Sequence, residues 1–248
     1  MKNLTTKLSL AAALTLAMGT LGAPVAHAEE AVPDHVVTYN VAVASDYRYR
    51  GLTQTRFEPA LQGGADYTHN PSGMYAGVWA STIKWIDDAG GDANVEVDLY
   101  GGKRGDIGAG FSYDVGGLYY WYPSNGLTPN ANTFELYGQV GYGPGYIKYS
   151  HATTNAFGTA DSKGSGYLDI GANIELSKGL LLNLHAGRQR VAHHSDLSYN
   201  DLKIGLTKDF GVVSLAVAAI KANTEAYVTP QSKNMGKSGL VVTVSKTF

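Results

Sequence analysis

Cysteine is absent from the 248-residue chain, which excludes disulfide scaffolds, thiol catalysis and cysteine-based metal sites. Charge is scarce, because charged residues make up only 16% of the chain against roughly 25% in an ordinary soluble domain. The formal net charge of −2 is too small to indicate a nucleic-acid partner. Long hydrophobic runs are missing beyond the N-terminal segment, so no transmembrane helix of about 18 apolar residues is expected.

The N-terminal segment has the three-part pattern of a secretory signal peptide. A basic head precedes an apolar run over residues 8–21, and Ala26-His27-Ala28 matches the A-x-A cleavage pattern. The apolar run is too short to span a bilayer as a helix. We therefore expect a signal peptide over residues 1–28 and a mature protein over 29–248, exported from the cytoplasm of a Gram-negative bacterium.

The mature chain is rich in glycine and tyrosine and shows period-2 alternation of apolar and other residues, which is typical of β-strands. In the first such segment, Val37, Tyr39, Val41 and Val43 alternate with smaller or more polar residues. Most segments are 9 to 13 residues long, enough to cross a bilayer at a tilt, which takes roughly 9–11 residues. We count 12 segments, at about 35–50, 58–70, 73–85, 93–104, 110–122, 133–142, 145–153, 165–176, 180–191, 199–209, 212–222 and 239–248.

Short turns and longer polar connections alternate between these segments, except that the connection at 105–109 is of intermediate length. Outer-membrane barrels show this asymmetry, with short periplasmic turns and longer outer loops. The last segment alternates and ends in Phe248, a form that the outer-membrane assembly machinery recognises. The sequence therefore predicts an all-β fold, a closed antiparallel transmembrane β-barrel of about 12 strands in the outer membrane. An exported soluble β-sandwich is the alternative fold.

The apolar faces are expected to contact lipid and the charged faces to line a wet lumen. On this basis Tyr75, Gly77, Trp79, Ile83 and Trp85 share a lipid-facing side of the third segment. Aromatic residues near strand ends are expected to form the girdles at the membrane interfaces. These are Tyr47, Tyr49, Trp85, Tyr119, Trp121 and Tyr122.

Five motifs along the mature chain are distinctive: VASDYRYRGLTQT at 43–55, PALQGGADY at 59–67, GMYAGVWAS at 73–81, EVDLYG at 96–101 and DVGGLYYWYP at 114–123. These motifs resemble those of the TorF porin family. The resemblance covers nearly all of the mature chain and implies an outer-membrane β-barrel with a pore function. The segment 102–110 departs from the family pattern, because it is richer in glycine and charge.

Asp46, Arg48 and Arg50 follow one another at two-residue steps, so they are expected on one face of the first strand. They could line the lumen and orient a passing solute, or form ion pairs that fill a lumen of intermediate width. For the second case the partners considered are Glu96, Asp98, Asp66 and Glu175. The predicted lumen-facing residues are Asp46, Arg48, Arg50, Asp66, Glu96, Asp98, Asp169 and Glu175.

The leading functional prediction is a porin-like channel for passive diffusion of small polar solutes or ions, with outer-membrane lipids and the assembly machinery as partners. A non-conducting scaffold or adhesin acting through outer loops such as 223–238 is the alternative. A membrane-embedded lipid hydrolase using Ser150 with His151 or His185 is less favoured, since the chain has no G-x-S-x-G, H-E-x-x-H or P-loop motif. No enzyme activity and no cofactor are expected. Adjacent loop histidines usually point apart, so His193-His194 is not predicted to bind metal.

Overall fold

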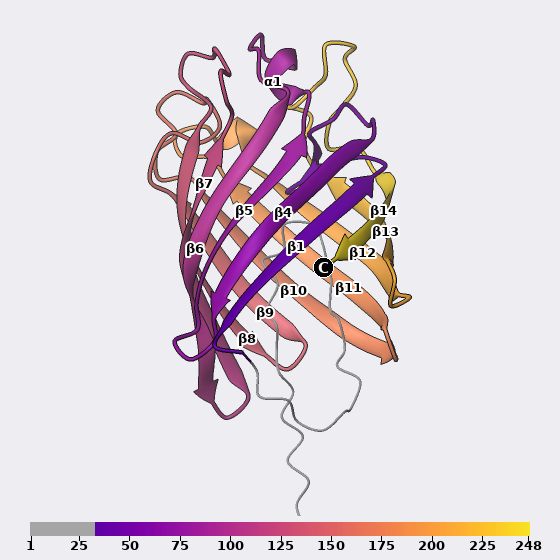
Figure 1. Ribbon diagram of the computed structural model, residues 1–248. Helices are drawn as coiled ribbons and strands as arrows, with labels where there is room; N and C mark the ends of the chain where they lie inside the picture. Colours follow the sequence, from indigo (N-terminus) through magenta and orange to yellow (C-terminus); the bar gives the residue numbers. More distant parts are fainter. Residues whose placement is uncertain (1–32) are drawn as a thin grey trace, which may run out of the picture.

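The alternating segments form one closed antiparallel barrel of 12 strands in the computed structural model, which describes residues 33–248 (Figure 1). The expected signal peptide lies outside the described residues. The wall strands are β1 (His35–Ala44), β4 (Ala60–His69), β5 (Met74–Thr82), β6 (Val95–Gly108), β7 (Phe111–Trp121), β8 (Thr133–Tyr142), β9 (Gly145–Ala152), β10 (Gly166–Ser177), β11 (Leu180–Arg190), β12 (Tyr199–Asp209), β13 (Ser214–Ala222) and β14 (Gly239–Thr247). The remaining elements are β2 (Arg48–Tyr49), β3 (Leu52–Thr53), a short helix α1 (Trp85–Asp88) and a 3-10 turn η1 (Ser195–Leu197).

The barrel closes where the first strand meets the last. β1 pairs with β14 over residues 40–44 and 243–247, and it pairs with β4 along its other edge. Beyond the strand, the Phe248 amide donates to the Tyr39 carbonyl at 2.8 Å. Over these residues the pairing satisfies the facing backbone groups of the two terminal strands, as a sheet inside hydrocarbon requires.

Tight turns and long loops alternate strictly around the barrel, as the short connections predicted. The expected exception at 105–109 was wrong, because β6 continues to Gly108 and reverses directly into β7. Gly108, Ala109 and Gly110 all have positive φ, at 93°, 52° and 82°, which permits this tight reversal at a glycine-rich site. The long loops, which therefore all lie at one end, are 45–59, 83–94, 122–132, 153–165, 191–198 and 223–238.

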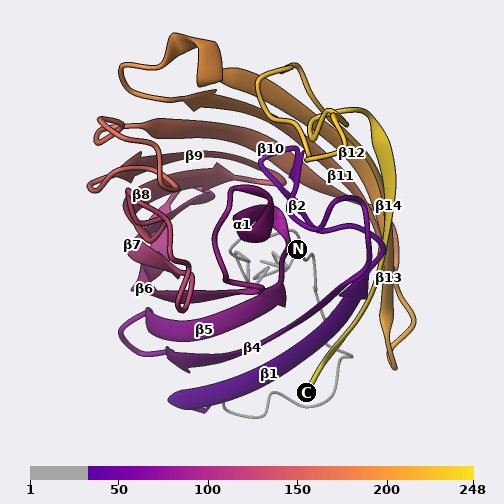
Figure 2. The same ribbon diagram turned by 90° about the horizontal axis from the view of Figure 1, so that it is seen from above.

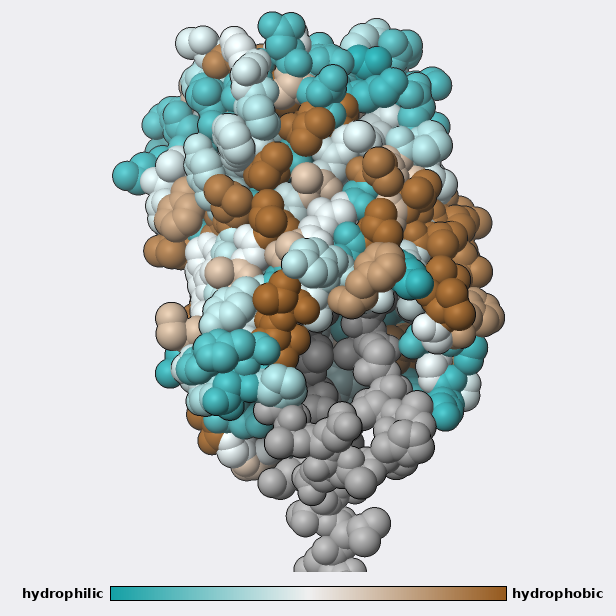
Figure 3. Space-filling model, viewed as in Figure 1, coloured by the Kyte–Doolittle hydropathy of each residue, from teal (hydrophilic) through white to brown (hydrophobic). Residues whose placement is uncertain are grey.

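The outer surface of the barrel wall is apolar and exposed. Val37, Leu202 and Ile204 are 53%, 60% and 56% exposed, although a soluble fold would bury residues of this kind. In Figure 3, hydrophobic residues gather at mid-height and hydrophilic residues cover the end that carries the long loops. This is the pattern of an outer-membrane barrel, with an apolar band against lipid. No helix among residues 33–248 is long and apolar enough to cross a membrane.

The lipid-facing side predicted for β5 was wrong. Tyr75 and Trp79 point inward and are only 8% and 6% exposed, whereas Met74 and Val78 face outward at 57% and 38%. Both faces of this strand are apolar, so alternation alone could not assign them. Trp79 joins an aromatic cluster that fills part of the lumen, and the Tyr75 hydroxyl contacts that of Tyr137, a member of this cluster.

Most of the predicted girdle is also inside the barrel. Tyr47 and Tyr122 are each 2% exposed, and Trp85 lies in α1 with its ring edge-on to Tyr122. Trp121 faces outward and is 42% exposed, as a girdle residue should be. Aromatic residues near strand ends therefore serve two purposes here, and strand position alone does not separate them.

The first predicted strand ends six residues early, at Ala44. The chain then folds into the barrel as residues 45–59, which we call the lumen hairpin and which contain the pair β2–β3. Its turn uses Arg50 and Gly51, with φ of 46° and 82°. Figure 2 shows β2 and α1 within the outline of the wall strands. Asp46, Arg48 and Arg50 therefore do not share one face of a wall strand, which corrects the prediction.

Candidate functional site: the lumen hairpin

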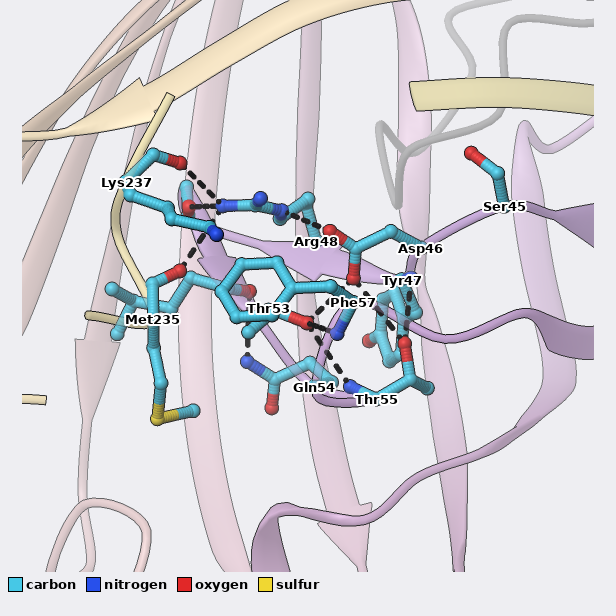
Figure 4. A network of polar contacts seen from close by, with 12 residues as sticks. Ser45, Asp46, Tyr47, Arg48, Thr53, Gln54, Thr55, Phe57, Met235 and Lys237 are labelled. Carbon is cyan, nitrogen blue, oxygen red and sulfur yellow. Dashed lines mark hydrogen bonds and ion pairs between the residues drawn. The ribbon is translucent and has the colours of Figure 1, made fainter. Parts of the chain in front are cut away.

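Short-range polar contacts close the base of the lumen hairpin (Figure 4). The Asp46 carboxylate accepts a hydrogen bond from the Thr53 hydroxyl at 2.5 Å and pairs with Arg48 Nε through its other oxygen. The Tyr47 amide donates to Thr55 Oγ1 at 3.1 Å. An Asp at the start of such a segment and two threonines opposite it satisfy backbone and side-chain groups locally, which favours a turn over a continued strand.

Arg48 fastens the hairpin to the long loop 223–238. Its Nη1 donates to three carbonyl oxygens, those of Gly51, Met235 and Lys237, at 3.0–3.1 Å. The Phe57 ring lies under two cations, with Arg48 Cζ at 5.0 Å and Lys237 Nζ at 4.5 Å from its centre. Figure 4 shows Arg48 between Asp46 and the segment that carries Met235 and Lys237.

Arg50, at the tip, binds two wall strands far from the hairpin's origin. Its Nη2 lies 2.6 Å from Glu135 Oε2 on β8, and its Nη1 donates to Gln189 Oε1 on β11 at 2.8 Å. The guanidinium lies 4.3 Å from the centre of the Tyr167 ring. Burial lowers the pKa of Arg50, but the Glu135 carboxylate outweighs this effect and leaves the pKa well above its ordinary value. Arg50 is therefore a fixed positive charge inside the lumen.

Gly51 presses the hairpin tip against a third part of the wall. A Cβ at this position would lie 2.6 Å from Asp201 Cβ on β12 and 3.0 Å from Ala222 Cβ on β13. The residue also has a left-handed φ of 82°, so both the space and the backbone conformation favour glycine. Since the hairpin originates between β1 and β4, its tip reaches across the lumen.

Two further contacts hold the hairpin from above. The Gln54 carbonyl accepts hydrogen bonds from the amides of Lys84 at 2.8 Å and Trp85 at 3.2 Å, where α1 begins. Arg56 forms an ion pair with Asp88 at the other end of α1. The hairpin is thus attached to loops 83–94 and 223–238 as well as to the wall.

Packed aromatic residues close the lumen on the β5–β8 side. The Tyr47 hydroxyl donates to Glu96 Oε1 at 2.6 Å, and the Tyr49 hydroxyl donates to that of Tyr120 at 2.7 Å. Burial, with the neighbouring Glu96 charge, raises the pKa of Tyr47 well above its ordinary value. Tyr47 therefore remains a neutral donor. The cluster contains Tyr47, Ala60, Trp79, Ile83, Ile86, Ala93, Leu118, Tyr120, Tyr122, Ala131 and Tyr137.

On the opposite side, next to Arg50, a cavity of about 110 Å³ remains. Its lining mixes cations, carboxylates and hydroxyls with a few apolar groups. The lining residues are Tyr47, Arg48, Tyr49, Arg50, Gly51, Leu118, Tyr120, Tyr146, Lys148, Ser150, Tyr167, Asp169, His185, Asp201, Lys203 and Ile220. At the level of the hairpin the lumen is therefore polar on one side and aromatic on the other.

The eight predicted lumen residues occupy different environments. Asp46, Arg48, Glu96, Asp98 and Asp169 are buried, at 7% exposure or less. Arg50 and Asp66 are partly buried, and the Asp66 carboxylate accepts a hydrogen bond from the Tyr100 hydroxyl at 2.6 Å. Glu175 is exposed at the turn end of β10. Asp98 stands apart among the described residues, because both its oxygens are buried without a hydrogen-bond partner.

The arginines do not pair with the acids considered from the sequence. Arg48 pairs with Asp46, and Arg50 pairs with Glu135. Glu135 and Gln189 were missed because each lies more than 80 residues from Arg50 along the chain. The alternation of inward and outward residues along β8 could have indicated Glu135, because Glu135 shares the inward face with Thr133 while Leu136 points outward.

His185 and the His193-His194 pair have structural partners. The His185 ring nitrogens lie 2.7 Å from Asp169 Oδ1 and 2.7 Å from Asp201 Oδ1, so both are engaged by carboxylates. His193 Nδ1 lies 2.8 Å from the Asp161 carbonyl, and His194 Nε2 lies 2.7 Å from that of Ala160. Across residues 33–248, no cluster of three or more His, Asp or Glu side chains is placed to hold a metal ion.

A family model described as "Bacterial protein of unknown function (Gcw_chp)" matches residues 27–248. The chain belongs to this family. No curated protein matches it in sequence. A solved KdgM porin is similar in structure, with a TM-score of 0.55, 8% identity, and coverage of 86% of this chain and 98% of that one. A KdgM porin in complex with disordered oligogalacturonate gives a TM-score of 0.50 and 6% identity over 86% and 97% of the two chains.

These likenesses concern the fold, because the identities are low. They agree with the closed barrel described above, whose fold is that of outer-membrane porins. The motif resemblance to the TorF family is consistent with that architecture, and the specific family name remains a prediction.

Proposed function

We propose that this protein is a narrow outer-membrane pore for small polar solutes or ions, and that the lumen hairpin sets its aperture. The supporting observation is the position of Arg50, whose side chain reaches Glu135 and Gln189 beside a polar cavity of about 110 Å³. The cavity is small and lined by charged and hydroxyl groups, which suits ions and small polar solutes. Larger solutes would need the hairpin to move.

The lining supports a preference for polar solutes without fixing one sign of charge. Lys148 and Lys203 face the same cavity as Asp169 and Asp201, so cations and anions both find partners there. Asp46, Arg48 and Arg50 belong to the hairpin, and Asp66, Glu96, Asp98, Asp169 and Glu175 to the surrounding wall. We also propose that the signal peptide is cleaved after Ala28 during export, and that the outer-membrane assembly machinery recognises Phe248.

Single-channel recording in planar bilayers tests the pore. We expect discrete conductance steps from the refolded protein, with heat-modifiable gel migration as the check of folding. The variant Arg48→Glu/Arg50→Glu should shift ion selectivity toward cations, because it replaces two positive charges that line the cavity by negative ones. A folded barrel that conducts at no voltage would refute the proposal. Unchanged selectivity in a conducting variant would remove these arginines from the path.

A non-conducting scaffold is the second candidate, and one observation favours it. The hairpin is fixed to loops 83–94 and 223–238 as well as to the wall, so the lumen and the outer loops form one connected structure. Replacing residues 46–57 by a short Gly-Ser linker separates the two functions. If only this variant conducts, the native barrel is closed and its loops carry the function.

A further inference from the structure

Three basic residues lie on the outward face of the wall, on the strands β11 and β13. Arg188, Arg190 and Lys221 face outward and are exposed, and all three lie toward the long-loop end. No Asp or Glu faces outward in that half of β10 to β14, among the described residues. The acids nearest in sequence, Asp196 and Glu225, belong to the loops that leave these strands.

Basic residues on the lipid-facing side of a barrel need an anionic partner or water, because hydrocarbon solvates a charge poorly. Internal partners here are few: Arg188 donates to Asn200 Oδ1 at 3.2 Å and Arg190 to the Gly164 carbonyl at 3.2 Å. Both acceptors are neutral. The positive charge of this patch is therefore uncompensated by the outward side chains of the neighbouring strands.

An apolar groove of about 840 Å³ lies immediately below these bases. Leu184, Leu202, Ile204 and Leu240 line it with large side chains, while Ala186 and Ala219 leave space between them. The strand register places Ala186, Leu202 and Lys221 in one row across β11, β12 and β13. Lys221 therefore stands at the rim of the groove itself.

The register also fixes the spacing of the bases. Arg188 is opposite Asn200, and Lys221 is opposite Leu202, two residues further along β12. Two strand spacings and a two-residue offset separate their Cα atoms by roughly 12 Å. Two long basic side chains at this separation can bind the same phosphorylated headgroup from opposite sides.

We propose that this surface binds a phosphorylated glycolipid of the outer leaflet, with an acyl chain in the groove and a phosphate between Arg188 and Lys221. The charge complementarity decides the occupant, because an uncharged or zwitterionic lipid would leave the bases uncompensated. The long-loop end of such barrels faces outward, so the patch lies at the level of the outer leaflet. The inference does not depend on conduction by the lumen.

The test is native mass spectrometry of the folded full-length protein titrated with bis-phosphorylated lipid A. We expect one bound lipid A, and at least about tenfold weaker binding by Arg188→Gln/Lys221→Gln. The control Lys103→Gln/Lys246→Gln removes two outward bases from the turn end and should bind normally. Ala186→Phe/Ala219→Phe fills the groove without changing charge and should also weaken binding.

Other outcomes would overturn the proposal. Equal binding by Arg188→Gln/Lys221→Gln and the native protein would exclude the bases, and normal binding by the groove-filling variant would exclude the acyl-chain site. Equal retention of phosphatidylethanolamine would show a general lipid surface. Displacement of lipid A by millimolar inorganic phosphate alone would indicate a site for free anions rather than for lipid. Heat-modifiable migration confirms that each variant is folded before it is compared.

Discussion

Replacing Arg50 by Met should release the tip of the lumen hairpin. The substitution leaves the Glu135 carboxylate, which is 2% exposed, with the Tyr120 hydroxyl at 3.3 Å as its remaining side-chain donor within residues 33–248. Removing one partner of a buried ion pair costs about 3–5 kcal/mol, and the neighbouring polar cavity argues for the lower end. A loss of about 3 kcal/mol changes an equilibrium roughly 100-fold. The lost free energy shifts the equilibrium between the docked and the displaced hairpin, because the closed ladder of wall strands does not depend on the Arg50–Glu135 contact.

The expected result is a larger and more frequent open level in single-channel records of Arg50→Met. Trypsin added outside should also cut the variant faster at Arg48 or Arg56, since a displaced hairpin exposes both. Glu135→Gln in the same chain should restore part of the closed population, because no unpaired charge then remains. Lys103→Met, an exposed outward change on β6, serves as the control.

The reasoning fails if Arg50→Met gates and resists trypsin like the native protein. It fails equally if the single and double variants behave alike, because the coupling between Arg50 and Glu135 would then be absent. Arg50→Lys should open and be cut by trypsin at levels between those of the native protein and Arg50→Met. Lysine keeps the positive charge but lacks the forked guanidinium that reaches Glu135 and Gln189 together.

Three further predictions concern the hairpin and the wall. Gly51→Ala should raise conductance, because the added methyl group pushes the hairpin tip from the wall. Gly211→Ala should not raise conductance, since Gly211 has a similar φ of 80° but no atom within 4 Å of the added methyl position. Equal effects of the two substitutions would mean that backbone strain alone causes the change. Ile204→Arg places a charge against lipid and should destabilise the barrel by about 2–4 kcal/mol in urea unfolding, and an unchanged midpoint would place this residue outside the membrane. The Lys84 ammonium holds the pKa of Glu58 below its ordinary value of 4.5, so the contact is present at neutral pH and is lost as pH falls through that lowered pKa. In that acidic range the open level in single-channel records should become modestly more frequent in the native protein but not in Glu58→Gln. The same acid response in both proteins would assign the effect to another titrating group.

The wall was predictable because its determinants are local. Alternation gives the strands, and tight turns such as Gly143-Pro144 mark their ends, so strand number and closure followed from the sequence. The boundary at 105–109 was misplaced because a segment rich in glycine and charge resembles a loop, yet the ladder between β6 and β7 continues past Lys103 and Arg104 to Gly108.

The lumen hairpin was not predictable from alternation, because Asp46 to Arg50 continues the same period as β1. What ends the strand is a combination of the Asp46–Thr53 contact, the Arg50-Gly51 turn and the distant Glu135. Only the first two are visible nearby in the sequence. The inward position of Trp79 has a similar origin, since the hairpin supplies the apolar surface on which it packs.

The origin of the hairpin between β1 and β4 has a consequence for how such proteins can diversify. These two strands already pair with each other over ten residues, and Ser45 alone of the inserted segment bonds to the closing strand, through its amide to the Val242 carbonyl and its hydroxyl to the Val242 amide. The segment's length and side chains can change while the lipid-facing surface stays the same. The filling of the lumen and the fit of the wall to the membrane can therefore vary separately in this fold, and relatives with unrelated inward segments can share one barrel.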